Sequence, residues 1–357
     1  MNIPFALRRP WLLFGGARAD RDQPDLAALG SITDPERFVW AILPHAARSF
    51  ATSILLLPAA KALTAAVAYL YCRMLDTYED LGLPEETGAS LSAFAARMRT
   101  MAPPPKPPRA ARDNRDRAHV LLIDRCELVD RVFATLPTSH QNQIITLVES
   151  MAAGMVWSAQ RFAEQGGVLV DDEQLARYCH IVIGEPALFA LALVEATELT
   201  PQLREDALAS SELIQLANIT RDIERDLERG IAYHPSLLPY LRHPGSDEAI
   251  GRARRRLMAR ALPQVSAYAR LAGQLAQQRV GLARAPAITM LLHTDRHYRW
   301  CARRVGMPPW KGPDANVSIV AAALLAAVSR RWSDRVTRRV EHDFHAAAAD
   351  LEQALLL

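Results

Sequence analysis

Apolar residues recur at three- and four-residue steps along most of the chain, which is the pattern of helices with a buried face. The clearest run includes Leu63, Val67, Leu70 and Met74 and predicts a deeply buried helix after Pro58. Further helices are predicted up to about residue 164, over 172–197, 201–229, 247–282 and 285–305, and twice more around the 306–314 loop. No series of alternating positions indicates strands, so we predict an all-α fold.

Two segments interrupt this periodicity. Residues 1–34 are rich in Pro, Gly, Arg and Asp and predict an irregular N-terminal arm. Residues 81–117 hold a cluster of prolines with basic neighbours and predict an inserted loop. Helical enzymes built around one large apolar cavity reach this length without splitting, so we predict one helical domain over residues 35–357.

Composition supports a core of helix-forming aliphatic side chains, because 50% of the residues are hydrophobic and only 6% are aromatic. The formal net charge of +3 is small for 357 residues, so no nucleic-acid partner is predicted. The four cysteines form no metal-ligand pattern and are interpreted as reduced thiols. We find no signal sequence, and every apolar run is shorter than the roughly 20 residues that span a bilayer. These features predict a cytoplasmic protein without a membrane-spanning helix.

A basic run near the C-terminus leaves an alternative for its location. Its arginines stand at helical spacing and are typical of a solvated helix face. They are Arg330, Arg331, Arg335, Arg338 and Arg339. Because they follow the apolar run 317–328, peripheral attachment to a membrane surface is the alternative interpretation. The oligomeric state stays unknown from the sequence.

The first candidate motif is Asp-Thr-Tyr-Glu-Asp at residues 76–80, which ends the buried helix. Its i, i+4 spacing places Asp76 and Asp80 on one helix face, one turn apart. Two carboxylates there repel each other unless a cation lies between them, and Mg²⁺ prefers such oxygen ligands. The alternative is an acidic last turn, which the helix dipole disfavours.

The second motif lies in the helix predicted over 201–229. Asn218, Asp222 and Asp226 stand at i, i+4 and i+8, so three oxygen ligands share one stripe. A surface ladder of Asp–Arg ion pairs is the alternative for this motif taken alone. Two such stripes on separate helices favour a site for Mg²⁺ and a diphosphate.

Such a site would support ionisation of an allylic diphosphate. Mg²⁺ and arginines neutralise the leaving diphosphate, and a dry apolar wall protects the resulting carbocation from water. Arg48, Arg73 and Arg221 lie within or beside the two motifs and are candidate diphosphate ligands. Each could instead belong to a structural ion pair.

Several ordered segments together are specific enough to indicate a family. Ala-Arg-Ser-Phe at 47–50, the stretch 68–80, Tyr-Cys-His-Ile-Val-Ile-Gly at 178–184 and the stretch 215–235 resemble the squalene/phytoene synthase family. The resemblance extends over about residues 38–236. It implies the isoprenoid synthase fold, a helical bundle with a central apolar cavity.

The resemblance also implies roles for particular residues. It implies Mg²⁺ and diphosphate binding by Asp76, Asp80, Asn218, Asp222 and Asp226. It implies that the substrate sites are lined by Arg48, Ser49, Phe50, Tyr69, Arg73, Gln215, Asn218 and Arg221. Tyr178 is the candidate for orienting charge or protons near the reacting carbons, with a buried, hydrogen-bonded tyrosine as the alternative.

The implied reaction joins two prenyl diphosphates head to head through a cyclopropyl diphosphate. The motifs are closest to bacterial squalene synthases, which predicts farnesyl diphosphate as substrate and NADPH as a cofactor if squalene is the product. Phytoene-type condensation of geranylgeranyl diphosphate is one alternative. A class I terpene cyclase and a non-catalytic assembly protein of the same fold are two others.

Several positions depart from the family pattern, among them Arg225 and residues 156–158. Ala47 stands where a serine is usual, which removes one hydroxyl from the diphosphate region. Glu185 and Pro186 follow the 178–184 motif where small or aliphatic residues are usual, and the proline predicts a kink beside the cavity. These changes leave ionisation intact as a prediction and leave the product open.

Overall fold

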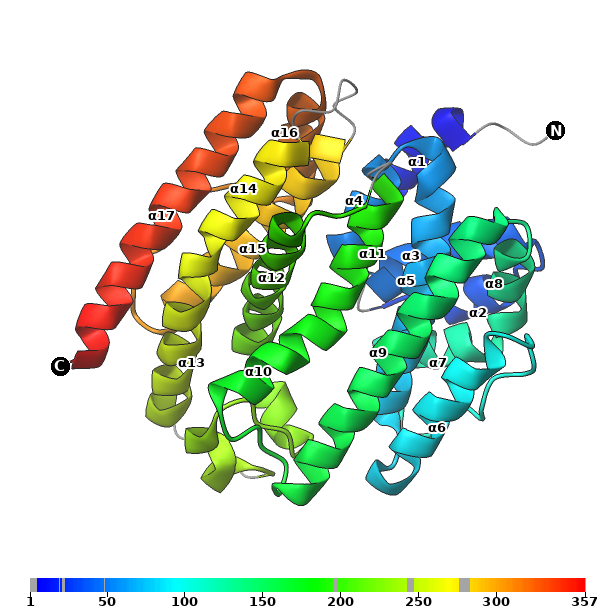
Figure 1. Ribbon diagram of the computed structural model, residues 1–357, viewed down its shortest axis with the longest axis horizontal. Coiled ribbons are helices and arrows are strands. Elements are labelled where there is room, and N and C mark those ends of the chain that lie inside the picture. Colours follow the sequence, from blue (N-terminus) through cyan, green and yellow to red (C-terminus); the bar gives the residue numbers. More distant parts are fainter. Residues whose placement is uncertain are drawn as a thin grey trace. The chain divides into compact units, whose positions relative to one another are not determined.

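The computed structural model describes residues 5–356 except 19, 21–22, 48, 195–197, 243–246 and 276–282. The described residues are almost entirely helical, which confirms the predicted all-α fold (Figure 1). Their one β feature is an isolated bridge between Val168 and Ala232. The contacts divide the chain into two compact units, Met1–Ala159 and Gln160–Leu357, and the single helical domain over residues 35–357 stays a prediction.

The first unit is arranged around α5, the long helix predicted after Pro58. Its helices are α1 (Phe5–Arg18), α2 (Leu26–Gly30), α3 (Pro35–Ala47), α4 (Ser49–Leu56), α5 (Ala59–Leu81), α6 (Pro84–Arg97), α7 (Asn114–Asp124), α8 (Cys126–Phe133) and most of α9 (Thr138–Glu164). Val67, Leu70 and Met74 are fully buried, as their spacing predicted. Helices α3, α4, α6, α7 and α8 all pack against α5.

The irregular arm predicted over residues 1–34 is wrong, because this segment contains α1 and α2. Its prolines and glycines were given too much weight as helix breakers. Long-range contacts hold α1 in place: the Phe5 ring packs 4.8 Å from that of Trp40, and Arg9 donates a hydrogen bond to the Leu57 carbonyl. Asp25 caps the start of α2.

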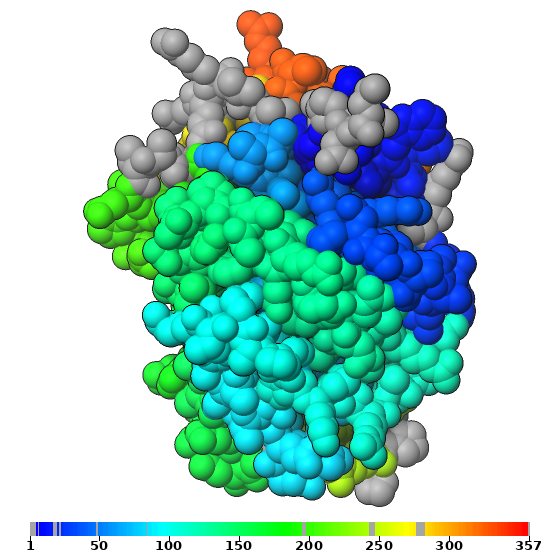
Figure 2. Space-filling view, turned by 90° about the vertical axis from the view of Figure 1, so that its right-hand side faces the viewer, coloured from blue at the N-terminus to red at the C-terminus, as the bar shows by residue number. Residues whose placement is uncertain are grey.

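The loop predicted over residues 81–117 is also partly wrong, because α6 occupies its first half. Pro84 stands in the first turn of that helix, where proline is well tolerated, and Glu85 and Glu86 favour the same end of the helix dipole. Figure 2 shows this helix (cyan) beside α9 (green), where Gly88 approaches Val156. Within the predicted loop, the stretch 98–113, which holds most of its prolines, lacks regular structure.

The second unit is arranged around α12. Its helices are α10 (Asp172–Cys179), α11 (Glu185–Val194), α12 (Pro201–Glu228), α13 (Asp247–Ala261), α14 (Val265–Leu275), α15 (Arg284–Arg304), α16 (Asn316–Val328) and α17 (Arg330–Leu356), with short 3₁₀ turns at Pro235–Tyr240 and Leu262–Gln264. Helices α10, α11, α13, α14 and α15 all contact α12. The predicted ends at about residues 229 and 305 agree with these helices to within one residue.

Helices α10 and α11 are continuous through a π-helical turn, His180–Gly184. The N–H of Glu185 bonds to the His180 carbonyl, five residues back. This wider turn lies just before Pro186, which has no N–H to give to an α-helical bond. The structure therefore has a π turn where the sequence predicted a kink.

By length and composition alone, the stretch Asp172–Val194 could cross a membrane, and it is the one such helix among the described residues. We had predicted none, because His180, Glu185 and Pro186 divide its apolar residues into short runs. Buried core helices pass the same test, and Leu191 of this stretch packs in a buried cluster with residues of α12 and α14.

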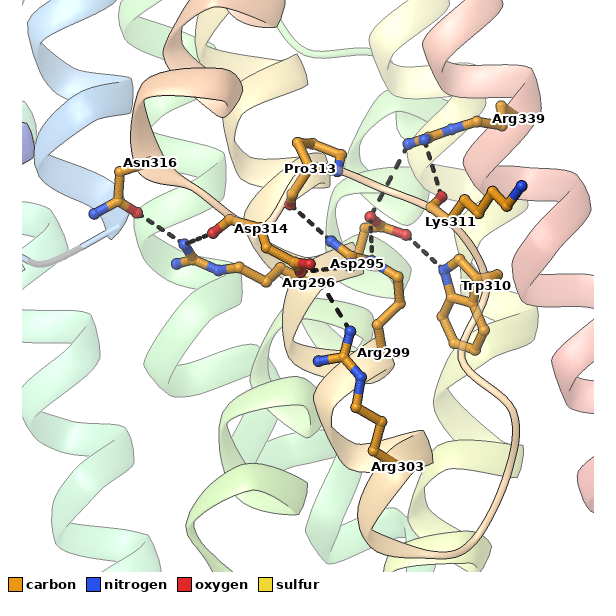
Figure 3. Close-up of polar contacts among 10 residues, drawn as sticks. All are labelled: Asp295, Arg296, Arg299, Arg303, Trp310, Lys311, Pro313, Asp314, Asn316 and Arg339. Atoms are coloured by element: carbon orange, nitrogen blue, oxygen red, sulfur yellow. Dashed lines mark hydrogen bonds and ion pairs between the residues drawn. The ribbon is translucent and has the colours of Figure 1, made fainter.

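A buried polar cluster fixes the loop between α15 and α16 (Figure 3). Arg299, which is 1% exposed, donates to Asp295 at 3.1 Å and to the Pro313 carbonyl at 2.7 Å. Trp310 donates its indole N–H to Asp295 at 2.7 Å. A Cβ on Gly312 would lie 2.6 Å from Asp295, so the loop approaches this pair too closely for any side chain. The cluster therefore determines where α16 begins.

Replacing Asp295 with alanine is expected to lower the free energy of unfolding by about 3 kcal/mol, because the buried Arg299 would keep only its more exposed partner Asp314 and Trp310 would lose its acceptor. Urea denaturation followed by circular dichroism measures this change. The matched control is Asp334→Ala, which removes the partly exposed partner of the exposed Arg330 at 4.0 Å and should cost no more than about 1 kcal/mol. Equal losses in the two variants would contradict the role assigned to the cluster.

Candidate functional site

Four predicted site residues form one stripe along α5. Tyr69, Arg73, Asp76 and Asp80 stand at i, i+4, i+7 and i+11, so they share a helix face. Tyr69, Arg73 and Asp76 are partly buried and Asp80 is exposed, whereas most of their neighbours on this helix are fully buried. The buried neighbours anchor the helix and leave this polar stripe open to a ligand.

Arg73 links the members of this stripe. Its guanidinium lies 3.1 Å from the Asp76 carboxylate and donates to the Tyr69 hydroxyl at 3.0 Å. Burial alone would lower the pKa of Arg73, but Tyr69, Asp76 and Asp80 together raise it. Burial also raises the pKa of Tyr69, so its hydroxyl stays protonated. The arginine is thus a permanent cation beside Asp76.

The Ala-Arg-Ser-Phe segment lies next to this stripe. The Phe50 ring packs on the Tyr69 ring with their centroids 5.5 Å apart. Ser49 is the first residue of α4 and is partly exposed. Arg48, the third predicted diphosphate ligand, lies outside the described residues.

Two residues near the first motif were missed by the sequence analysis. The buried Ser158 of α9 donates a hydrogen bond to Glu79 at 3.0 Å, so Glu79 is directed away from the stripe formed by its neighbours. His119 of α7 is also buried, and burial, together with the charges of Arg73 and Arg115, lowers its pKa well below 6.5. The Ser158–Glu79 hydrogen bond and the effect of Arg73 on His119 join segments far apart in the sequence. The spacing of residues along one helix therefore gave no signal for them.

The second predicted stripe runs along α12. Asn218, Asp222 and Asp226 rise on one face, with Gln215 one turn before them. The Asn218 amide donates to the Gln215 side chain at 3.2 Å. The apolar residues between them, Leu216, Ile219 and Ile223, are buried, as the interpretation required.

Arginines of the same helix pair with both carboxylates. Arg221 binds Asp222 in a two-pronged contact and also reaches His297 of α15 at 3.3 Å. Burial alone would lower the pKa of Arg221, but its hydrogen bond to Asp222 raises it. Arg229 lies 3.6 Å from Asp226. Arg229 was not among the predicted site residues, although its i+3 spacing from Asp226 could have indicated it.

Tyr178 belongs to a cluster of three aromatic side chains in the second unit. Tyr233 donates its hydroxyl proton to the Tyr178 hydroxyl at 3.0 Å, and the two rings lie 5.1 Å apart. Phe162 packs edge-on against both rings. Tyr178 is 6% exposed, so its hydroxyl is oriented by a neighbour and largely shielded from water.

A glycine-dependent turn holds this cluster together. Gly167 accepts from the Ala232 N–H at 2.8 Å, and the Ala232 carbonyl accepts from Leu169 at 3.1 Å. A Cβ on Gly167 would lie 2.3 Å from the Gly230 carbonyl oxygen, and its φ of +95° already disfavours a side chain. The contact places Tyr233, which follows Ala232, next to the ring of Tyr178.

The donor set of each stripe, taken by itself, fits a hard divalent cation. The stripe on α5 supplies two carboxylates and the stripe on α12 two carboxylates and an amide, and Mg²⁺ prefers such oxygen ligands over nitrogen and sulfur. Within the described residues, no three His, Cys, Asp or Glu side chains converge closely enough to hold a metal. Each stripe supplies two carboxylates, so substrate phosphates would have to complete the coordination of an ion.

The first unit also has a cavity of about 600 Å³ beside the proline-rich stretch. Its lining includes Lys106, Arg109 and Arg117 together with Leu26 and Leu121. It shares no residue with the stripe on α5, so we do not assign the chemistry to it.

Comparison with known proteins places this chain in a family. The family model described as squalene/phytoene synthase matches residues 43–299. A solved complex of TcSQS with the ligand BPH1237 is similar with a TM-score of 0.67 and 18% identity, over 90% of this chain and 98% of that one. A TcSQS complex with E5700 gives 0.60 and 17%, over 89% and 99%. No curated protein sequence matches the chain significantly.

The chain therefore belongs to the squalene/phytoene synthase family, and it has the all-α fold of squalene synthase structures. Members of this family are prenyltransferases that condense prenyl diphosphates head to head. They generally use a divalent metal to bind these substrates.

Replacing Gly167 with alanine is expected to lower the free energy of unfolding by at least about 2 kcal/mol, because the new methyl group meets the Gly230 carbonyl in a disfavoured backbone conformation. Gly166→Ala is the matched control, since its φ is +68° and nothing lies within 4 Å of its Cβ. The control should cost about 1 kcal/mol. A urea midpoint for Gly167→Ala equal to that of the control would contradict the proposed close approach.

Stability is expected to fall as pH drops below 6.5, the ordinary pKa of histidine, because folding holds the pKa of His119 below this value. At that pH the His119 imidazole binds a proton in the unfolded chain but not in the folded chain. The stabilisation is complete above pH 6.5 and is lost as pH falls towards the lowered pKa. Thermal unfolding between pH 7.5 and pH 5 should show a smaller loss for His119→Gln than for the wild type. Parallel curves would show that another group is responsible.

Proposed function

We propose that this chain catalyses the Mg²⁺-dependent head-to-head condensation of two farnesyl diphosphates to a squalene-type C30 product. Membership of the family supports the reaction class. The observation that carries the proposal within this chain is the pairing of every stripe carboxylate on α12, and of Asp76 on α5, with an arginine of its own helix. Both charges that a metal–diphosphate complex requires are therefore present on the same helix faces.

The metal ligands in this proposal are Asp76 and Asp80 on α5 and Asn218, Asp222 and Asp226 on α12. When bound, Mg²⁺ would neutralise the diphosphate and so make it a better leaving group. Arg73 and Arg221 would bind diphosphate oxygens, since each already presents a guanidinium beside a carboxylate.

The arginine contacts also suggest how the ligand-free site stays stable. Without a cation, neighbouring carboxylates on one helix face repel each other by a few tenths of a kcal/mol per pair. Arg221 and Arg229 offset this by holding Asp222 and Asp226. With their carboxylates occupied by a metal, Arg221 and Arg229 would be free to bind diphosphate oxygens, which match carboxylate oxygens in charge and geometry.

Tyr178 is proposed to act after ionisation. Its hydroxyl accepts from Tyr233, so its lone pair and ring face have a fixed direction. A fixed, electron-rich aromatic ring stabilises a carbocation, and the shielded hydroxyl is a local acceptor for a proton lost from carbon. Tyr233→Phe should then alter the product ratio more than the consumption of substrate.

Incubating the purified protein with farnesyl or geranylgeranyl diphosphate and Mg²⁺, with and without NADPH, tests the proposal by mass spectrometry of the extracted hydrocarbons. A C30 product from farnesyl diphosphate is expected, with squalene appearing only when NADPH is added. A C40 triene would identify phytoene-type condensation instead, and a monomeric cyclised product would identify a class I cyclase. Absence of turnover with every allylic diphosphate would favour a non-catalytic assembly protein.

Asp76→Ala and Asp222→Ala are each expected to lower kcat/KM by at least about a hundredfold, because each removes a proposed metal ligand. Chelation of the metal should abolish turnover, and added Mg²⁺ should restore it. Helicity should be unchanged, since neither side chain is buried. Glu228→Ala, at an exposed position of α12, is the matched control and should retain full activity. Full activity of either aspartate variant would contradict the assignment of the ligands.

A further inference from the structure

Helix α16 presents an apolar face to solvent. Val317, Leu324, Leu325 and Val328 are between 47% and 81% exposed. They stand at i, i+7, i+8 and i+11, which places them on one side of the helix. Its opposite side, with Ile319, Ala323 and Ala326, is fully buried. The helix therefore has two apolar faces, of which only one is covered by the described part of the chain.

No charged residue occurs in α16, yet arginines follow it immediately. Arg331, Arg335 and Arg338 stand at i, i+4 and i+7 on α17 and are all exposed. None of the three makes an ion pair or hydrogen bond within the described residues, whereas Arg254 and Arg270 of the same unit each bind a carboxylate. Their charges are therefore available to an external anion.

Exposed apolar side chains are concentrated on two helices. Seven of the twelve large hydrophobic side chains that are exposed among the described residues lie on α1 and α16. On α1 they are Leu7, Trp11 and Phe14, again at i, i+4 and i+7. Tryptophan favours the boundary between water and lipid. Single exposed apolar residues are normal, but stripes of this kind indicate an interaction surface.

We propose that α16 is an interfacial helix that docks this protein on an anionic lipid bilayer, with Arg331, Arg335 and Arg338 binding lipid phosphates. A helix of 13 residues is about 20 Å long, which is too short to span the roughly 30 Å hydrocarbon core. Lying in the plane of the surface, it would bury its exposed face at the acyl boundary. The long arginine side chains would keep their guanidiniums at the level of the headgroups.

The arginines favour a bilayer over a second copy of this chain. Packing two α16 faces together around a twofold axis would bring the two sets of unpaired arginines near each other, and like charges repel. An anionic lipid surface neutralises the same arginines.

Flotation with vesicles tests this proposal. The full-length protein is expected to bind vesicles of phosphatidylcholine mixed with phosphatidylglycerol, more weakly as salt rises, and to bind pure phosphatidylcholine poorly. Leu324→Glu/Leu325→Glu should lower the partition coefficient at least about tenfold, because both charges would enter the acyl boundary. Arg331→Gln/Arg335→Gln/Arg338→Gln should lower it roughly a hundredfold, since each basic residue contributes about a factor of five.

Two matched controls address non-specific effects. Val170→Glu/Leu238→Glu places the same charges on exposed apolar positions elsewhere in the unit, and Arg204→Gln/Arg252→Gln/Arg256→Gln removes three other exposed arginines. Neither should reduce binding as much as its counterpart. Circular dichroism should show that all variants keep their helicity, as expected for exposed positions.

Wild-type binding by Leu324→Glu/Leu325→Glu would overturn the proposal, as would absence of binding by the wild type. Light scattering that shows a dimer in solution, lost in the same variant, would assign this face to a second copy of the chain instead. Flotation and light scattering need no prenyl diphosphate, so their results do not depend on whether the proposed reaction is correct.

Discussion

The repulsion between carboxylates one turn apart on a helix is the constraint on which both stripes depend. The chain meets it in the same way in each unit, with an arginine three or four residues from an aspartate, or adjacent to it, on the same helix. Because most residues on the other faces of α5 and α12 are buried, packing fixes the rotation of each helix and hence the direction of its stripe. Packing of the core thus determines the side of each helix on which the carboxylates and arginines lie.

The predictions that held are those that depend on helical periodicity. The buried residues of α5 fix its rotation, so Asp76 and Asp80 could be placed on one helix face from spacing alone. The arginine pairs were not predicted, because Arg221 is adjacent to Asp222 and Arg229 lies just past the end of α12. The metal ligands and the substrate positions stay predictions, because the ions and substrates that would define them are not part of the chain.

The predictions that failed depended on treating proline and glycine as breakers wherever they cluster. Pro84 starts a helix and Pro10 lies inside one, because what a proline does is decided by its position in the helix and by the surrounding packing. The hydrogen bond of Ser158 to Glu79 and the packing of Gly167 on Gly230 join residues more than 60 positions apart. Contacts of this kind have no local pattern and become visible only in three dimensions.

The π-helical turn at His180–Gly184 has a consequence for anyone who engineers α11. A π turn holds one residue more than the α-helical turn it replaces, so every later side chain is rotated by about 100° from the position that simple counting from Tyr178 would give. Chimaeras that exchange α11 between relatives must therefore carry residues 180–184 with it. Deleting one residue from this turn would redirect every side chain of α11 while leaving the composition of the helix unchanged.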